Sequence, residues 1–318
     1  MRVWLLAAWA IVVAVFCASP ARAAADEPTR VRVGIFIVQL TEPDLRTGTF
    51  ESVFWLWFRW RGDEALDPMK KFEVVGGQVE ALDNQDSRTH EGEHYQIARV
   101  RATIRQTFDI SAFPQDAHDL RVAVEETTDS LLGIVYEPDV ANSRLEPGVT
   151  LSGWTIGEPR VQAGSKNYAS NFGDPALPTE AESAYAVFSI SVPVSRPGVG
   201  YTLKLFWSIY LSVFVAILAF WIKATDLDPR FGLGIGAVFA AMASAYVVSS
   251  TLPDTNQVTT ADKVVMWSIA FIVLSLIEST VALLFCHAGN ERTAALLDKA
   301  SFVVMGTGYV LVNVVLLS

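Results

Sequence analysis

The clearest catalytic pattern in the sequence is the run His90-Glu91-Gly92-Glu93-His94. On a helix, two histidines four residues apart bind one zinc ion and the glutamate polarises its water, as in zinc peptidases. Here a glycine lies inside the motif, no apolar period flanks it, and a strand pattern follows directly. A weak divalent-ion site on a loop fits these side chains better. We keep a zinc metallopeptidase as a remote alternative and expect no catalytic residue, no metal and no cofactor.

A second group of charged residues, Asp226, Asp228 and Arg230, precedes the apolar stretch 229–253. That stretch is free of charge for about 20 residues and ends at Pro253, so it can cross a bilayer once. Carboxylates or arginines at the mouth of a pore select ions by their field. We therefore take Asp228 and Arg230 as candidate selectivity residues.

One face of this stretch is unusual for a helix in contact with lipid. It carries Gly232, Gly236, Phe239, Ala243, Tyr246 and Ser250. Copies of such a helix around a symmetry axis enclose a pore, which the Phe239 side chains narrow to a hydrophobic gate. The alternative is that Gly232 and Gly236 form a small-xxx-small packing motif against a neighbouring helix.

The 318-residue chain is 51% hydrophobic, which is too apolar for one soluble domain, so it must be divided. Residues 1–23 read as a signal peptide that ends in Ala21-Arg22-Ala23. Residues 24–198 carry 27 acidic and 16 basic side chains, whereas residues 199–318 carry 7 and 6. The exported domain is strongly acidic. This charge attracts cations and argues against a nucleic-acid partner.

The exported domain has alternating patterns typical of strands. Val31–Ile37, Phe50–Trp60 and Ile97–Phe108 are the clearest, residues 61–95 look loop-rich apart from a short strand at Phe72–Val79, and residues 163–184 look flexible. We predict an all-β, immunoglobulin-like sandwich of about ten strands. Trp55 and Trp57 lie on the face opposite the core side of their strand, beside Arg59. That face is either a binding surface or a face buried between two sheets.

Residues 199–318 contain four apolar runs, and we predict a four-helix transmembrane domain. The expected helices are about 201–222, 231–252, 263–286 and 300–317. Cys286 is the one cysteine left after signal cleavage, so no intrachain disulfide can form. Glu278 lies within the third run, where a carboxylate is either hydrogen-bonded structure or a proton-sensitive element.

An exported β-sandwich followed by four membrane helices resembles the pentameric ligand-gated ion channels, the Cys-loop receptor superfamily in its bacterial form. Phe113-Pro114-Gln115-Asp116 resembles the signature loop, with Gln106 and Leu120 where animal members have paired cysteines. The run GTFESVFWLWFRWRGD is similar to the second strand of the family, with Trp60 at its structural tryptophan. Arg196, Arg230 and Leu252-Pro253 match the arginine before the first span and the two ends of the pore helix.

The resemblance implies a homopentamer with an agonist pocket between subunits. The side chains expected there are Trp55, Trp57, Glu125, Glu126, Tyr168, Phe172 and Tyr185. Aromatic faces beside carboxylates suit a cationic amine, although these aromatics could also be ordinary packing. The Trp-x-Pro-Asp segment of the family is not recognisable within residues 61–95, and the first span, reading LFWSIYL, lacks the usual proline. The pocket therefore need not follow the family pattern.

The resemblance also implies a coupling region between the two domains. Its expected members are Asp44, Phe113, Pro114, Asp116, Arg196 and Pro253. Arg196 placed between Asp44 and Asp116 would link the sandwich to the helices through charge-assisted hydrogen bonds. The alternative is that the same cluster simply holds the domains together.

The sequence thus predicts a channel in the bacterial inner membrane that conducts small ions, with cations favoured by the acidic domain. Its amino-terminal domain would lie in the periplasm. The expected partners are four further copies of the chain, a small-molecule or proton agonist, permeant ions and the lipid bilayer. The main alternative is a non-conducting sensor or structural oligomer of the same architecture.

Overall fold

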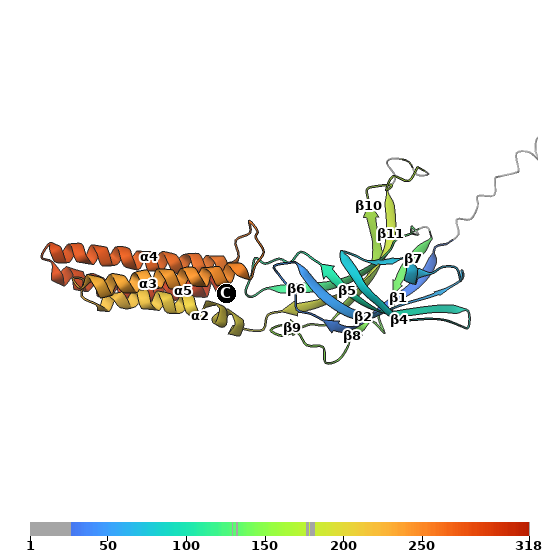
Figure 1. The fold of residues 1–318 in the computed structure, drawn as a ribbon, viewed down its shortest axis with the longest axis horizontal. Helices are drawn as coiled ribbons and strands as arrows, with labels where there is room; N and C mark the ends of the chain where they lie inside the picture. The colour runs from blue at the N-terminus through green and yellow to red at the C-terminus, as the bar shows by residue number, and fades with distance from the viewer. Residues whose placement is uncertain (1–26, 129, 132, 176–177, 179–181, 318) are drawn as a thin grey trace, which may run out of the picture.

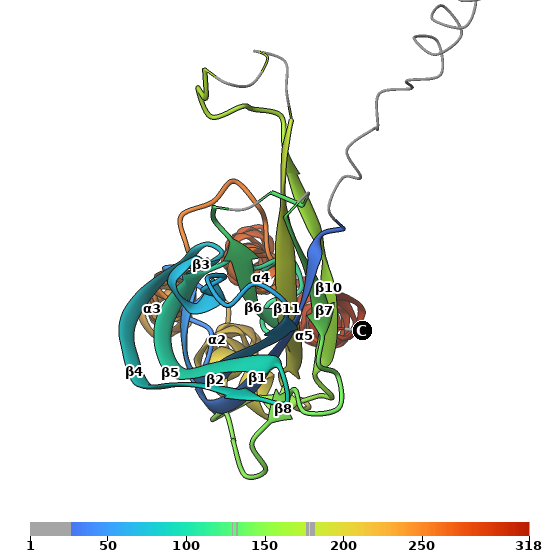
Figure 2. The same ribbon diagram turned by 90° about the vertical axis from the view of Figure 1, so that its right-hand side faces the viewer.

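The computed structural model describes residues 27–128, 130–131, 133–175, 178 and 182–317. A β-rich domain and a bundle of long helices lie end to end, and a hairpin of two strands projects sideways from the β-rich domain (Figure 1). Viewed along the long axis, the helices lie end-on behind the strands (Figure 2). The predicted signal peptide, residues 1–23, lies outside the described residues.

The first sheet has six strands in the order β4-β5-β2-β1-β7, with β8 paired to β1. Their bounds are β1 (Thr29–Leu40), β2 (Thr49–Arg61), β4 (Gly77–His90), β5 (Glu93–Arg105), β7 (Ile134–Pro138) and β8 (Arg144–Leu145). The predicted inward residues of β2 and β5 are buried, at 3% exposure or less. They are Phe54, Leu56, Phe58, Trp60, Ala98, Val100, Ala102 and Ile104.

The second sheet has five strands in the order β10-β11-β6-β3, with β9 paired to β11. Their bounds are β3 (Phe72–Val74), β6 (Ala117–Glu126), β9 (Thr155–Ile156), β10 (Arg160–Tyr168) and β11 (Ser183–Ser195). Side chains of both sheets share one buried core, because each strand turns its apolar alternate positions inward. The predicted all-β sandwich is confirmed, with eleven strands in the described chain.

Residues 61–95, expected to be loop-rich, are largely strand, and residues 163–184, expected to be flexible, are strand at both ends. Residues 61–95 contain the single-turn helix η1 (Pro68–Lys70), β3 and the 14-residue β4, and residues 163–184 include the end of β10 and the start of β11. β4 is an edge strand that pairs only with β5, and its side chains are exposed or half-buried. Backbone hydrogen bonds stabilise it, so its sequence carries no apolar alternation.

The helical domain consists of four long helices. They are α2 (Gly200–Leu218), continued by the short helix η2 (Ala219–Trp221), then α3 (Leu227–Ser250), α4 (Thr260–His287) and α5 (Glu291–Leu317). The fourth helix begins at Glu291 and not near residue 300, because Ala294 and Asp298 turn into the bundle although the segment is polar. The C-terminal end of α5 lies at the end of the bundle that faces the sandwich (Figure 1).

Candidate functional site

The predicted pore face of α3 is exposed throughout. Phe239 and Tyr246 are 72% and 74% exposed, and Gly232, Gly236, Ala243 and Ser250 are also exposed. The opposite face is packed against the other helices through Gly234, Ala237, Ala241, Ser244 and Val248. Within one subunit, this stripe of α3 is therefore not covered by other helices. It is the face that α3 would turn toward a symmetry axis shared by several subunits.

The two glycines of that stripe do not pack within the subunit. A Cβ atom placed on Gly232 or Gly236 would meet no atom within 4 Å. A Cβ on Gly234 would come within 2.3 Å of the Leu276 side chain on α4. The close helix contact inside the subunit therefore uses Gly234 and leaves the predicted pore glycines free of it.

Arg230 is buried inside the bundle and does not lie on the exposed stripe of α3, which corrects its predicted place among the selectivity residues. Its side chain is fully buried and donates hydrogen bonds to the Ile222 carbonyl at 2.9 Å and to Glu278 Oε2 at 3.0 Å. It also donates to Asp298 on α5. The carboxylates of Glu278 and Asp298 compensate the charge of the guanidinium inside the bundle. The sequence around the start of α3 does not indicate these partners, because they lie on other helices. Asp228, two residues earlier, is exposed.

Glu278 therefore belongs to an ion network that joins α3, α4 and α5. This geometry agrees with the first of the two roles expected for an intramembrane carboxylate, namely hydrogen-bonded structure. Sequence spacing did not indicate Asp298, because it lies before the apolar run of the fourth helix.

At the domain junction, Asp116 and Arg196 form an ion pair. Arg196 Nε donates to Asp116 Oδ1 at 2.8 Å, and the Arg196 backbone amide donates to the Asp116 carbonyl at 3.2 Å. The other carboxylate oxygen, Oδ2, lies 2.6 Å from His118 Nε2. Burial opposes ionisation of Asp116, but the His118 hydrogen bond and the Arg196 charge outweigh it and lower the pKa of the carboxyl.

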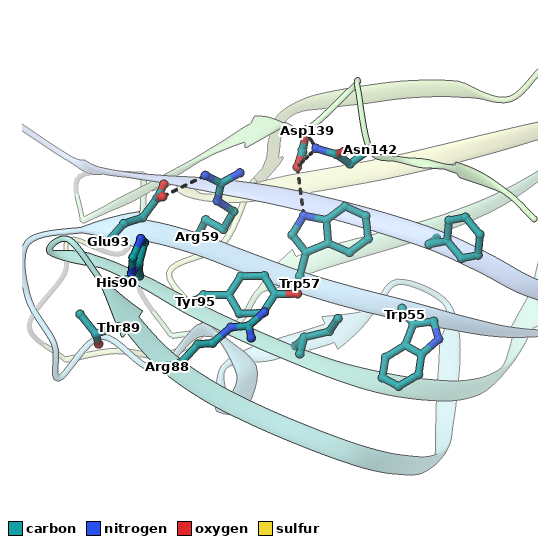
Figure 3. A pocket seen from close by; sticks show the side chains of 12 residues that line it. Trp55, Trp57, Arg59, Arg88, Thr89, His90, Glu93, Tyr95, Asp139 and Asn142 are labelled. Carbon is teal, nitrogen blue, oxygen red and sulfur yellow. Dashed lines mark hydrogen bonds and ion pairs between the residues drawn. The ribbon is translucent and has the colours of Figure 1, made fainter.

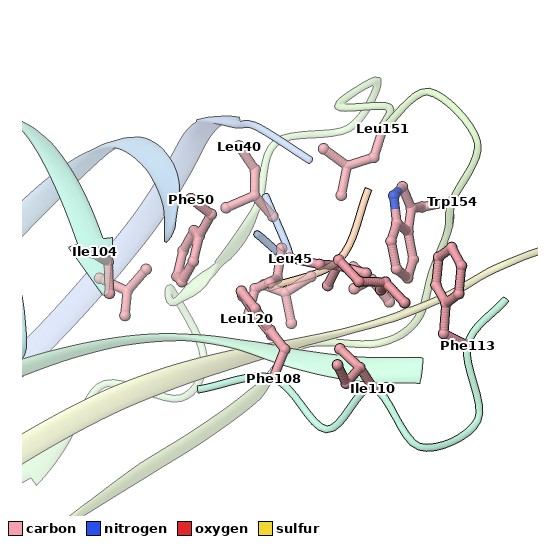
Figure 4. Packing of buried hydrophobic residues seen from close by; sticks show 14 of the residues in the cluster. Leu40, Leu45, Phe50, Ile104, Phe108, Ile110, Phe113, Leu120, Leu151 and Trp154 are labelled. Carbon is pink, nitrogen blue, oxygen red and sulfur yellow. The ribbon is translucent and has the colours of Figure 1, made fainter. Parts of the chain in front are cut away.

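Aromatic rings hold the Arg196 guanidinium in place. Its central carbon lies 4.2 Å from the ring centres of both Trp154 and Tyr201, and 5.5 Å from that of Phe113. Trp154 and Phe113 are adjacent in the buried cluster at the base of the sandwich (Figure 4). Such cation–π contacts fix the position of the arginine as well as its charge. Tyr201 lies in the first turn of α2, so the contact spans both domains.

The prediction that Asp44 joins Asp116 and Arg196 in this cluster is wrong. Asp44 is exposed and accepts hydrogen bonds from the backbone amides of Arg46 and Thr47, at 2.9 and 3.1 Å. Its short side chain closes its own turn, as aspartates often do. From the same turn, Arg46 reaches the Ser250 carbonyl of α3 at 3.4 Å. The second partner of Asp116 is therefore His118.

The signature loop also binds the start of α4 through its backbone. The carbonyls of Ser111 and Phe113 accept the amides of Thr260 and Ala261, each at 3.0 Å. These are helix-end donors that have no partner within α4 itself. Pro114 is buried next to Phe113, whereas Pro253, in the α3–α4 connection, is half-buried. The loop thus touches α4 directly, as well as α2 through Arg196.

Three of the predicted ligand residues form an aromatic cluster at the β10–β11 hairpin. The ring centres of Tyr168, Phe172 and Tyr185 lie 5.4 to 6.3 Å apart. Lys166 Nζ lies 4.6 Å from the Tyr168 ring and 3.4 Å from Glu125 Oε2. Phe172 is 62% exposed, so the cluster is open to a neighbouring molecule.

Glu126, although predicted beside this cluster, lies elsewhere. It is fully buried and accepts hydrogen bonds from the Thr128 amide at 3.1 Å and from Tyr136 Oη at 3.4 Å. Alternation along β6 explains the difference, because consecutive residues of a strand point to opposite sides. Glu126 is a structural residue of the sandwich.

Trp55 and Trp57 line a different cavity, of about 870 Å³, on the outer face of the first sheet (Figure 3). Trp57 is buried and donates through Nε1 to Asp139 Oδ2 at 3.1 Å, while Asn142 donates to both oxygens of that carboxylate. The Trp57 ring covers Gly34, where a Cβ would lie 2.1 Å from it. No sequence pattern indicated Asp139, which follows β7.

The two ligand groups are therefore not brought together within one subunit. The aromatic cluster lies on β10 and β11 of the second sheet, and Trp55 and Trp57 lie on β2 of the first. Trp57 is held by its own subunit and is not a free binding surface, whereas Trp55 is half-buried in the cavity wall. Whether the groups meet across a subunit interface stays a prediction.

His90 and His94 lie at the β4–β5 hairpin, so the helix that a zinc peptidase needs is not there. Glu91 and Gly92 have φ values of 51° and 73°, as a two-residue hairpin turn requires. His94 contacts Thr89 Oγ1 at 3.0 Å and the Gly62 carbonyl at 3.3 Å. Within the described residues, no group of three or more His, Cys, Asp or Glu side chains could hold a metal ion.

All four long helices are long and apolar enough to cross a membrane. No protein-family model matches the chain. It is 22% identical over 317 residues to a proton-gated ion channel of Gloeobacter violaceus, and the alignment covers 94% of this chain and 85% of the relative. The chain is therefore a multi-pass membrane protein that is similar, in sequence and in its arrangement of a β-sandwich before four helices, to the pentameric ligand-gated ion channels.

Proposed function

We propose that this protein is a homopentameric ligand-gated ion channel. It acts in the bacterial inner membrane, with residues 24–198 in the periplasm and the α3 helices around the pore. The observation that carries this proposal is the exposed α3 stripe from Gly232 to Ser250, whose opposite face is packed in the bundle. Fivefold assembly would turn five such stripes toward one axis.

We propose that Phe239 forms the gate. It is the bulkiest apolar side chain in the central part of the stripe, between Gly236 and Ala243. A ring of five phenylalanines would exclude water and stop ions when the helices are close together. The Phe239→Ala variant should leak in the absence of agonist. Recordings from purified protein in planar bilayers measure this directly, with Met242→Ala as control, since Met242 is an exposed α3 residue outside the stripe.

Cations are the favoured permeant ions in this proposal. Five Asp228 carboxylates would lie at one end of the pore, whereas Arg230 is buried and compensated by Glu278 and Asp298. Of the two candidate selectivity residues, only Asp228 therefore contributes an exposed charge close to the proposed ion path. Currents recorded under a salt gradient should reverse near the cation equilibrium potential. Reversal near the anion potential would contradict the assignment of Asp228.

The agonist is either a proton or a small amine. The first follows from the relative, which is named as a proton-gated channel. The second follows from the aromatic cluster of Tyr168, Phe172 and Tyr185 beside Glu125. A series of pH steps and primary amines applied to the same bilayers separates them. A verified pentamer that stays silent throughout, including as Phe239→Ala, would favour the non-conducting sensor.

A further inference from the structure

His118 is the one buried histidine among the four of the chain, at 7% exposure. It lies near the start of β6, and its Nε2 is 2.6 Å from Asp116 Oδ2. An ionised carboxylate can only accept, so Nε2 carries the hydrogen of the neutral ring. Among the described residues no hydrogen bond reaches Nδ1, which leaves that nitrogen as the basic atom.

A surface cavity borders this histidine, although its ring is packed. Phe108 and Trp154 contact the ring, with centre-to-centre distances of 5.0 and 5.6 Å. A surface cavity of about 270 Å³ is lined by His118 together with Thr155, Pro193 and Ser195. A proton can therefore arrive from the periplasmic solvent while the aromatic contacts hold the ring in place.

The charged groups around His118 come from three segments. Asp116 precedes it in the chain, Arg196 follows β11 and shares Asp116 with it, and Asp109 in the signature segment interacts with it through charge. Asp119 is exposed on the outer side of β6 and is paired with Arg160. The pKa of Asp116 is already lowered, so this carboxylate stays ionised where an imidazole ordinarily titrates.

We propose that His118 is a proton-binding site through which periplasmic acid acts on the domain junction. The inference rests on the proposed channel function and names its agonist. A proton from water adds to Nδ1, and the imidazolium then competes with Arg196 for the single carboxylate of Asp116. Arg196 lies four residues before α2, and the segment of Asp116 holds the start of α4 through Ser111 and Phe113. Protonation therefore changes the net charge at the site where the sandwich contacts α2 and α4.

The test compares His118→Gln with His94→Gln. Glutamine keeps a hydrogen-bond donor for Asp116 but cannot be protonated at the pH where an imidazole ordinarily titrates. Acid-evoked current in bilayers should be lost in His118→Gln, or its pH midpoint should move toward acid by at least about one unit. His94→Gln makes the same change at a half-buried histidine on β5 and should respond as the unchanged protein does. An unaltered acid response in His118→Gln overturns the proposal.

A second readout does not require ion flux. Trp154 touches His118, so a titration of intrinsic fluorescence on the purified full-length protein should show a histidine step. The step should be present in His94→Gln and absent in both His118→Gln and Trp154→Phe. A step in a protein that carries no current with acid, with amines or as Phe239→Ala would retain the proton site and reject the channel. A step that persists in His118→Gln would assign the titration to another group and reject the site.

Discussion

Arg196 and Arg230 are both paired with buried carboxylates, and they differ in what surrounds them. Arg230 is fully buried between three membrane helices and bonds two carboxylates and a carbonyl. Arg196 lies half-buried at the domain junction, stacks on aromatic rings and shares one carboxylate with a histidine. The first network is enclosed in the bundle, whereas the second is next to a water-accessible cavity.

The difference suggests that the Arg230 network has one stable arrangement of partners, whereas the partners in the Asp116 network can change. Around Arg230 any loss leaves a buried charge uncompensated, so the arrangement resists change. Around Asp116 one carboxylate serves two donors, Arg196 on one oxygen and His118 on the other, so the balance between the donors depends on the charge of His118. We infer that the Arg230 network fixes the packing of α3, α4 and α5, while the Asp116 network is the part that can switch.

The largest effect should come from Arg230→Met. This change leaves Glu278 and Asp298 buried without their cation, at a cost of about 3–5 kcal/mol of stability. Thermal unfolding of the purified protein should show a much lower midpoint and loss of pentamers. The matched control is the triple variant Arg230→Met, Glu278→Gln, Asp298→Asn, which removes all three charges and should recover most of the loss. A fully stable single variant would contradict the compensated network.

Arg196→Gln should affect gating more than assembly. It removes the ion pair with Asp116 and the cation–π contacts, together about 1–3 kcal/mol, at a half-buried site. Pentamers should form, but agonist-evoked current should fall strongly, because the contact spans the sandwich and α2. Arg46→Gln is the control on a different inter-domain contact, to the Ser250 carbonyl. Equal loss of current in both variants would mean that the Asp116 network contributes no more to gating than the Arg46 contact does.

Asp116 also predicts how stability depends on pH. Its folded-state pKa is lowered, so the unfolded chain binds the proton more readily. The stabilisation by Asp116 is therefore complete above the unfolded value, about 3.9, and is lost as the pH falls through the folded pKa. With His118→Gln as the common background, which removes the histidine titration, the difference in unfolding midpoint between Asp116 and Asp116→Asn should stay constant from neutral pH to about pH 5 and shrink below about pH 4. A difference that changed near pH 6 would contradict this.

Much of the architecture could be predicted, because alternation and long apolar runs report burial directly. Phe54 to Trp60 on β2 and the α3 stripe lie where their patterns placed them. β4 was missed because an exposed edge strand has no buried face to mark it. Arg230 was misplaced because its partners, Glu278 and Asp298, are far away in the sequence and only packing brings them together. The same limit hid the pairing of Asp116 with His118.

The smallest effect should come from Asp44→Asn. Asp44 was predicted to pair with Arg196 but instead closes its own turn, where the Thr47 side chain is the main reason that the pKa of Asp44 is lowered. Asparagine can accept the same backbone amides and suits the turn equally well. Agonist-evoked current and its pH midpoint should therefore match those of the unchanged protein. A clear shift in either quantity would show that Asp44 joins the Arg196 network in another state of the channel.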